Sequence, residues 1–435
     1  MKIGTPYHSG FALNQRLTIV VVLFFSLMGL IQCSTPSRLE PPTNIASIYN
    51  PSSSTFEPKF KLYHVNDSLS RLYVRFPLND LQFSTWNSNE GEHALVDLKY
   101  ILRIANDSNL VVDSMRVQFQ LKKNIEGYFV SNLPMRLKAG NFYTLEITSL
   151  DRYRGSKHFS FIEADKRFSD SREAFLLRTR NQMPLFEPYL RVGQTFRVES
   201  DHHSIDSIYV DFIAPLTEEA ELPYYLSPSK WPDPVIDTTY VFAHSDTTLI
   251  QLEEEGLYLF RLQDTGRVMW SMPVFNSFYP GTRTSEQLLE PLTYLTMPRE
   301  YRRLSGHPSL KAALDSFWLA STGNATRAKE LIRVYYSRIY FANRYFADYR
   351  EGWMSDRGMI YTIFGPPGTI YRVKGSERWI YGGNKNLSSM DFLFIRKENP
   401  WRTESYELVR QDLYKASWYQ AVDTWRNGRI YSVQN

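Results

Sequence analysis

The spacing of hydrophobic residues changes once along this chain of 435 residues, and that change most limits how the chain can fold. Upstream of about residue 281, apolar residues often recur at every second position, as in Met115, Val117, Phe119 and Leu121. Downstream they recur at every third or fourth position. A period of two is typical of strands with one face in a core, and a period near 3.6 is typical of amphipathic helices. The sequence therefore predicts a β-rich first part and a later part that contains helices.

Two β-sandwich domains are predicted in the first part. Residues 58–165 contain strand candidates separated by turn-prone segments such as residues 106–109, and residues 184–277 repeat this pattern. Short strands at such spacing are typical of an immunoglobulin-like sandwich. Residues 166–183 are expected to connect the two domains.

A C-terminal α+β domain is predicted over residues 281–435, with a small, mostly antiparallel sheet and packed helices. Thr284 and Gln287 fit a capping box that opens a helix. Residues 309–320 and 325–350 each place apolar side chains on one helical stripe. The multidomain fold expected is thus β-rich with a terminal α+β unit.

The stretch 352–368 reads GWMSDRGMIYTIFGPPG and is expected to turn the chain from a helix into a strand. Gly352 can adopt a positive φ and end the preceding helix, and Trp353 is large enough to anchor the corner in a core. Ser355 and Asp356 can accept hydrogen bonds from nearby backbone N–H groups. A structural role is favoured over an exposed recognition site and over a catalytic site.

A central strand is predicted after this corner. Arg357 can pair with a carboxylate or with the C-terminus of a helix. Both alternating sets of side chains in residues 359–364 are largely apolar, which is typical of a strand covered on both faces. Proline cannot donate to a sheet, so the strand is expected to end at Gly365, Pro366 and Pro367.

A characteristic set of mainly aromatic, arginine, glycine and proline residues is spread over the C-terminal part. It consists of Phe317, Trp318, Tyr335, Tyr336, Arg338, Gly352, Trp353, Ser355, Asp356, Arg357, Gly358, Tyr361, Gly365, Pro366 and Pro367. Over about residues 284–435 this set resembles the GWxTD domain, a family of exported bacterial proteins common in Bacteroidota. The sequence has Ser355 where the family has threonine, and serine keeps the hydroxyl group. The resemblance implies an undefined biochemical role and no established catalytic residue.

The N-terminus carries an apolar stretch that ends near the only cysteine of the chain. Residues 17–31 follow a basic segment and are too short to span a bilayer comfortably, which is typical of a signal peptide. The following LIQC resembles a bacterial lipobox, with Gln32 where a small residue is usual. We expect residues 1–32 to be a lipoprotein signal peptide, Cys33 to be lipidated, and residues 33–57 to form a flexible tether. An ordinary signal peptide or an uncleaved anchor is the alternative.

The expected function is that of a non-catalytic outer-membrane lipoprotein that faces the periplasm and acts as an interaction or scaffold subunit of the cell envelope. We expect it to contact the membrane through Cys33 and to bind an envelope protein, but no nucleic acid. The helix at residues 325–350 is the expected contact surface, because tyrosine and arginine are enriched at interfaces. Its candidate contact residues are Tyr335, Tyr336, Arg338, Tyr340 and Arg344.

The alternative is a glycan-binding or glycan-processing envelope lipoprotein, with Trp231, Trp379 or Trp401 as platforms for sugars. No catalytic residue, metal site or cofactor is expected. The sequence after Gly365 lacks the GK[ST] ending of a phosphate loop, and neither HExxH nor GxSxG occurs. One cysteine cannot form a cysteine pair for zinc.

Overall fold

The structure is a computed structural model. It describes residues 44–85, 91–105, 107–123, 127–169, 171–201, 204–226, 235–245, 248–263, 266, 268–373, 375–382, 389–397 and 405–432. These residues belong to one compact unit, Thr43–Asn435. The expected signal peptide and the lipidation site Cys33 lie outside the described residues. Among the described residues, no helix has both the length and the apolar character needed to cross a bilayer.

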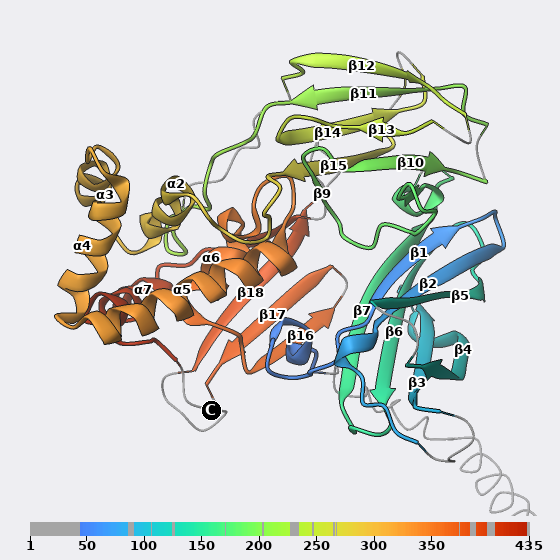
Figure 1. The fold of residues 1–435 in the computed structure, drawn as a ribbon, viewed down its shortest axis with the longest axis horizontal. Helices are drawn as coiled ribbons and strands as arrows, with labels where there is room; N and C mark the ends of the chain where they lie inside the picture. Colours follow the sequence, from blue (N-terminus) through green and yellow to red (C-terminus); the bar gives the residue numbers. More distant parts are fainter. Residues whose placement is uncertain are drawn as a thin grey trace, which may run out of the picture. The chain divides into compact units, whose positions relative to one another are not determined.

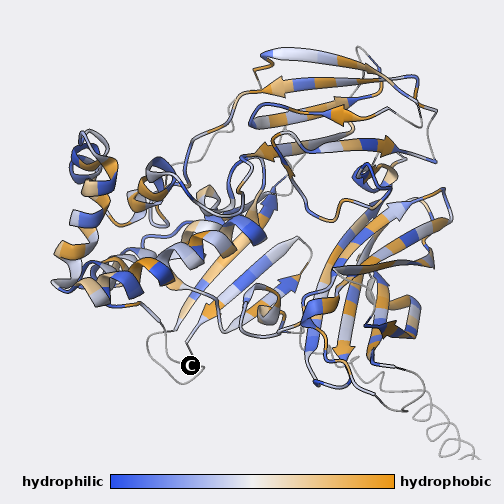
Figure 2. Ribbon diagram, in the orientation of Figure 1, coloured by the Kyte–Doolittle hydropathy of each residue, from blue (hydrophilic) through white to orange (hydrophobic). Residues whose placement is uncertain are grey.

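Two mostly antiparallel sheets built from the first part of the chain enclose one core (Figure 1). One sheet has the order β1 (Lys59–His64), β2 (Leu69–Pro77) and β5 (Tyr128–Arg136). The other has the order β4 (Asp107–Lys122), β3 (His93–Ile104), β6 (Asn141–Asp151) and β7 (Lys157–Lys166). Alternate side chains of both sheets point inward, and hydrophobic and polar bands accordingly alternate along the strands in Figure 2.

A second pair of sheets follows and encloses its own core. The stacked rings of Phe260 and Trp270 lie in this core with their centroids 4.6 Å apart. The segment predicted as a plain connection contains η3 (Arg172–Ala174) and the strand β8. The smaller sheet has the order β13 (Ile250–Gln251), β10 (Thr195–Glu199) and β8 (Leu176–Arg178). The larger has the order β12 (Thr238–Ala243), β11 (Ser207–Ile213), β14 (Gly256–Arg261), β15 (Trp270–Phe275) and β9 (Leu190–Arg191), with β9 parallel to β15.

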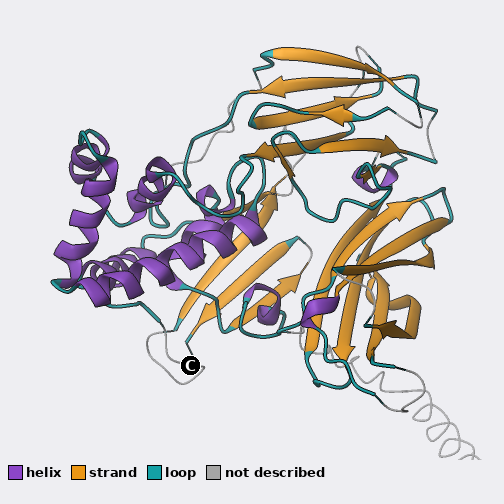
Figure 3. Cartoon of the chain, in the orientation of Figure 1, coloured by secondary structure: helices purple, strands orange, loops and turns teal. Residues whose placement is uncertain are grey.

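The C-terminal region is α+β, as predicted, and holds the α-helices among the described residues (Figure 3). The capping box is confirmed, because the Thr284 hydroxyl accepts from the Gln287 N–H and the Gln287 side chain accepts from the Thr284 N–H. The helical elements are α2 (Ser285–Leu289), η4 (Glu290–Tyr294), α3 (Pro298–Ser305), α4 (Leu310–Thr322), α5 (Ala325–Phe346), η5 (Gly352–Met354), α6 (Asp356–Phe364) and α7 (Tyr414–Arg426). The antiparallel sheet has the order β16 (Thr369–Val373), β17 (Ser376–Tyr381), β18 (Met390–Lys397) and β19 (Ser405–Leu408).

The prediction of a central strand at residues 359–364 is wrong, because these residues belong to helix α6. All nine residues of α6 are buried. A helix that is apolar on every side has no stripe, so its sequence cannot be distinguished from that of a strand covered on both faces. The polar residue that decides between them is Ser355, whose hydroxyl caps the first turn of α6 by accepting from the Gly358 N–H at 3.1 Å.

The prediction of a flexible tether is wrong for residues 44–57. Residues Ala46–Tyr49 form the turn η1, which lies beside β16 in Figure 1. The Ile45 N–H donates to the Ile370 carbonyl at 2.9 Å, and Tyr49 and Phe56 are buried. Apolar residues spaced among the serines and prolines therefore fix this segment to the folded unit.

Candidate functional site

The GWxTD-like stretch forms a corner in which two glycines allow backbones to touch. A Cβ atom on Gly352 would lie 2.1 Å from the carbonyl oxygen of Ala342 in α5, and one on Gly358 would lie 1.8 Å from the carbonyl oxygen of Gly352. Neither Gly352 nor Gly358 has a positive φ. Helix α5 ends at Phe346, before either glycine is reached. Gly352 is therefore required for close packing, and the predicted helix stop by positive φ is wrong.

Trp353 anchors the corner in the core, with 1% of its surface exposed. Its indole N–H donates to Glu351 Oε2 at 2.9 Å, and its backbone N–H donates to Asn343 Oδ1 in α5 at 3.0 Å. The edge of the Tyr294 ring packs against the indole. Burial raises the pKa of the Glu351 carboxyl to about 7, and the hydrogen bond from Trp353 only partly opposes that rise.

The Asp356 side chain binds strand β19 and the segment after it, and not the nearby turn that the sequence suggested. Its carboxylate accepts from the Leu408 N–H at 2.6 Å and pairs with Arg410 at 2.6 Å. These contacts join the first turn of α6 to β19 and to the segment after it. Asp356 is buried, so its charge is satisfied inside the domain and is not presented to solvent.

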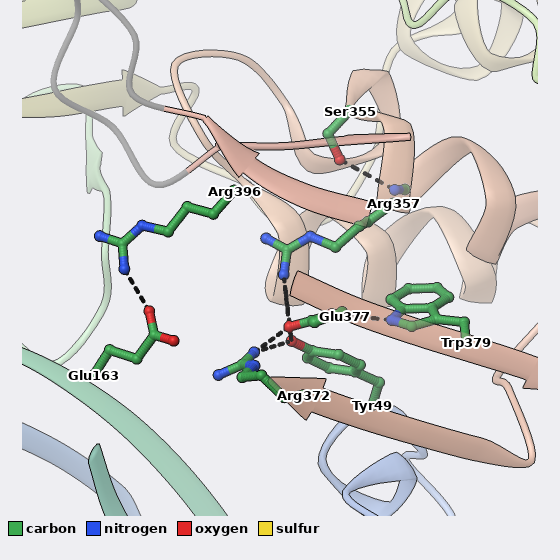
Figure 4. Close-up of polar contacts among 9 residues, drawn as sticks. Tyr49, Glu163, Ser355, Arg357, Arg372, Glu377, Trp379 and Arg396 are labelled. Atoms are coloured by element: carbon green, nitrogen blue, oxygen red, sulfur yellow. Dashed lines mark hydrogen bonds and ion pairs between the residues drawn. The ribbon is translucent and has the colours of Figure 1, made fainter. Parts of the chain in front are cut away.

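Arg357 belongs to a buried ionic cluster centred on Glu377, whose carboxylate is fully buried (Figure 4). Arg357 Nη1 lies 3.3 Å from Glu377 Oε1, and Arg372 forms a second ion pair with the same oxygen. The Tyr49 hydroxyl donates to Oε1 at 3.1 Å, and the Trp379 indole donates to Oε2 at 2.9 Å. The cluster thus joins η1 to the sheet and to α6.

The cluster holds one more positive charge than negative, because two guanidinium groups share one carboxylate. Burial alone would raise the pKa of Glu377, but Arg372 and Arg357 outweigh it and lower that pKa to about 2. The Arg357 guanidinium also stacks 4.1 Å from the centroid of the Tyr406 ring. Burial and the Glu377 charge raise the pKa of Tyr49 to about 12, so this phenol stays protonated and donates.

The Gly-Pro-Pro run ends α6 and not a strand. Gly365 has a φ of 85°, which favours glycine. Arg338 of α5 donates to the Ile363 carbonyl at 2.9 Å and so satisfies the end of α6. Pro366 is exposed and Pro367 is buried.

Helix α5 buries one face and exposes the other, and four of the five expected contact residues are buried or half-buried, which corrects the choice of those four residues. Tyr335 is fully buried and donates to the Pro291 carbonyl at 2.6 Å. Arg338 is also buried, and its guanidinium donates to the Ile363 carbonyl at the end of α6. Tyr336 donates to the Leu288 carbonyl, and Arg344 pairs with Glu57. Tyr340 alone of the five candidates is exposed.

The sequence did not reveal Tyr49, Arg372 and Glu377 as partners of the motif. Tyr49 lies 328 positions from Glu377 in the chain, and no local spacing links such residues. Within the described residues, no group of three His, Cys, Asp or Glu side chains could hold a metal ion. Of the suggested sugar platforms, Trp379 is buried, and Trp231 and Trp401 lie outside the described residues.

Residues 256–427 match the family model of the GWxTD domain. This range includes the corner, the ionic cluster apart from Tyr49, and the last strands of the second β region. The chain therefore contains a GWxTD domain over residues 256–427.

A comparison with curated proteins found no match. Among solved structures, a calcium binding mutant of Bacteroides uniformis beta-glucuronidase 2 is similar at 12% identity, over 38% of this chain and 17% of that chain, with a TM-score of 0.18. The chain thus spans less than a fifth of that protein. A likeness this slight carries no argument about fold or function.

Proposed function

We propose that this protein is a non-catalytic, membrane-anchored lipoprotein that acts as an interaction or scaffold subunit in the bacterial cell envelope. The observation that carries the proposal is the burial of the motif. Trp353, Asp356 and Arg357 all lie inside the domain, and each uses its polar groups on internal partners. A catalytic group must reach its substrate, whereas these groups brace α6 against neighbouring elements.

The two β regions serve as spacers and docking surfaces in this proposal. Each consists of two mostly antiparallel sheets around a shared core, an arrangement that suits an immunoglobulin-like sandwich. Such sandwiches present edges and loops to a partner while their cores stay rigid.

The anchor is the lipidated Cys33 at the periplasmic face of the outer membrane. Because Asn44 already belongs to the described folded part, the chain between Cys33 and Asn44 can span at most about 40 Å. The folded unit would therefore work close to the membrane surface. Cys33→Ala is expected to abolish incorporation of labelled fatty acid and to release the protein from the membrane fraction. Persistent acyl labelling of this variant would contradict the anchor.

The interaction role is tested by crosslinking intact cells, purifying the acylated protein and identifying bound proteins by mass spectrometry. A stoichiometric envelope protein is the expected result. The alternative, a glycan-binding lipoprotein, predicts no such protein and retention of the chain on immobilised envelope polysaccharide. Burial of Trp379 weakens that alternative, because this ring cannot stack on a sugar in the folded state.

A further inference from the structure

A cleft of about 340 Å³ lies where the first β region meets the C-terminal sheet. Three consecutive residues of β1, 60–62, and three of β7, 161–163, line it, together with Arg372 of β16 and Tyr406 of β19. The volume lies at the lower end of the range for ligand pockets. The cleft therefore has room for a few side chains of a partner.

The way the strands line this cleft indicates that it runs along their edges. Successive side chains of a strand point to opposite faces, so three residues in a row can border one cleft only if it lies beside the strand. β1 and β7 are each the outermost strand of their sheet. Outer strands are where extended peptides add to a sheet by backbone hydrogen bonds.

Two arginine side chains, Arg372 and Arg172, bring positive charge to the lining of the cleft. Arg372 shares the Glu377 carboxylate with Arg357, and its Nε–H is buried without a hydrogen-bond acceptor in the described part of the chain. The Arg172 side chain also lines the cleft and makes no hydrogen bond or ion pair with any residue that the structure describes. Two arginines thus have donors to spare at one place, and a carboxylate is the group that satisfies them best.

The carboxylates in the wall do not cancel this charge. Glu163 pairs with Arg396, as Figure 4 shows, and Glu187 pairs with Arg75. The third carboxylate of the lining, Glu173, also has an interaction of its own. Between them the walls are apolar and aromatic, with Phe161 stacked 4.8 Å from the Arg372 guanidinium. Since these carboxylates are already occupied, few acceptors remain for the hydroxyl groups of a sugar.

We propose that the cleft binds an extended segment of a protein partner, with an aspartate or glutamate directed at Arg372 and Arg172 and apolar neighbours against the walls. This proposal rests on the proposed interaction function and specifies where the partner docks. The main-chain groups of β1 or β7 supply affinity, and the two arginines supply selectivity for the acidic residue.

The test selects random heptapeptides displayed on phage against the immobilised full chain in detergent. Enriched peptides are then synthesised, and their affinities are measured with Arg172→Gln and with Arg299→Gln as the matched control. Arg299 is exposed on α3, away from the cleft lining. Arg172 has no described partner to lose, so Arg172→Gln is expected to fold with an unchanged unfolding midpoint.

The expected result is enrichment of peptides with Asp or Glu among apolar residues, about tenfold weaker binding to Arg172→Gln, and unchanged binding to Arg299→Gln. Replacing the acidic residue of the peptide by its amide should weaken binding to the same extent. Enrichment without acidic residues, equal binding by both variants, or displacement of the peptide by glucuronate at equal affinity would overturn the proposal. If Arg172→Gln still captures the crosslinked envelope protein in full, the cleft proposal fails while the interaction function stands. If peptides bind the cleft as described but crosslinking yields no protein, the interaction function fails instead.

Discussion

Neutralising Glu377 tests the ionic cluster directly. Its pKa falls from an ordinary 4.5 to about 2 in the folded protein. At 1.36 kcal/mol per pKa unit this corresponds to about 3 kcal/mol of stabilisation at neutral pH. Glu377→Gln keeps the shape and the acceptor for the Trp379 indole, but leaves two buried guanidinium groups without a counter-charge. We expect the free energy of unfolding to drop by about 3 kcal/mol at pH 7, in line with the cost of breaking a buried ion pair.

Urea unfolding followed by tryptophan fluorescence is the assay for this variant. Six of the nine tryptophans belong to the C-terminal part, namely Trp318, Trp353, Trp379, Trp401, Trp418 and Trp425, so the signal reports mainly on that region. Because the folded pKa is depressed, the contribution of Glu377 is complete above about pH 4.5 and is lost as the pH falls towards 2. The difference between wild type and variant should shrink over the same window. A loss no greater than that of the exposed control Glu330→Gln at pH 7 would refute the reasoning.

Two further predictions concern the corner. Gly358→Ala should lower the free energy of unfolding by more than about 3 kcal/mol in urea titrations, since the new Cβ would meet the Gly352 backbone, which cannot move aside. Gly323→Ala, with a positive φ but open space, is the control and should lose only about 1 to 2 kcal/mol; equal losses would contradict the close approach. Glu351→Gln should stabilise the protein by about 3 kcal/mol at pH 8 and by almost nothing at pH 4, because the raised folded pKa makes the wild type lose stability from about pH 4.5 to 7. A pH-independent difference between Glu351→Gln and wild type, measured by thermal unfolding, would contradict the burial of this carboxyl.

The strands and most helices could be predicted because each has one buried, apolar face and one solvent-exposed, polar face. β3 illustrates this: its residues Val96, Leu98, Tyr100 and Leu102 recur at every second position and are all buried, and the pairing register with β4 shifts only around Arg103, near the end of the strand. Helix α5 was likewise predicted from its apolar stripe. Helix α6 was missed because burial on every side removes the periodic signal, leaving only the Ser355 cap to indicate a helix start.

The candidate site was only half predictable. The sequence indicated that Trp353 would be an anchor and that Arg357 would pair with a carboxylate, and the structure places both in such roles. It could not name Glu377 or Tyr49, because their contacts depend on how distant segments pack. It also overestimated α5 as a surface, because tyrosine and arginine occur at interfaces and also, when hydrogen-bonded, in cores, as Tyr335 and Arg338 do here.

Amide hydrogen exchange across residues 352–364 tests most directly whether the motif is architecture. These residues are buried; the Gly352 N–H donates to the Tyr279 hydroxyl, the Trp353 N–H donates to Asn343 of α5, and the N–H groups after the first turn of α6 bond within the helix. The account predicts that peptides from this stretch, read by mass spectrometry, exchange only through global unfolding and as slowly as the central strand β3. Exchange within minutes at neutral pH, while β3 stays protected, would show an open and accessible corner and would contradict the account.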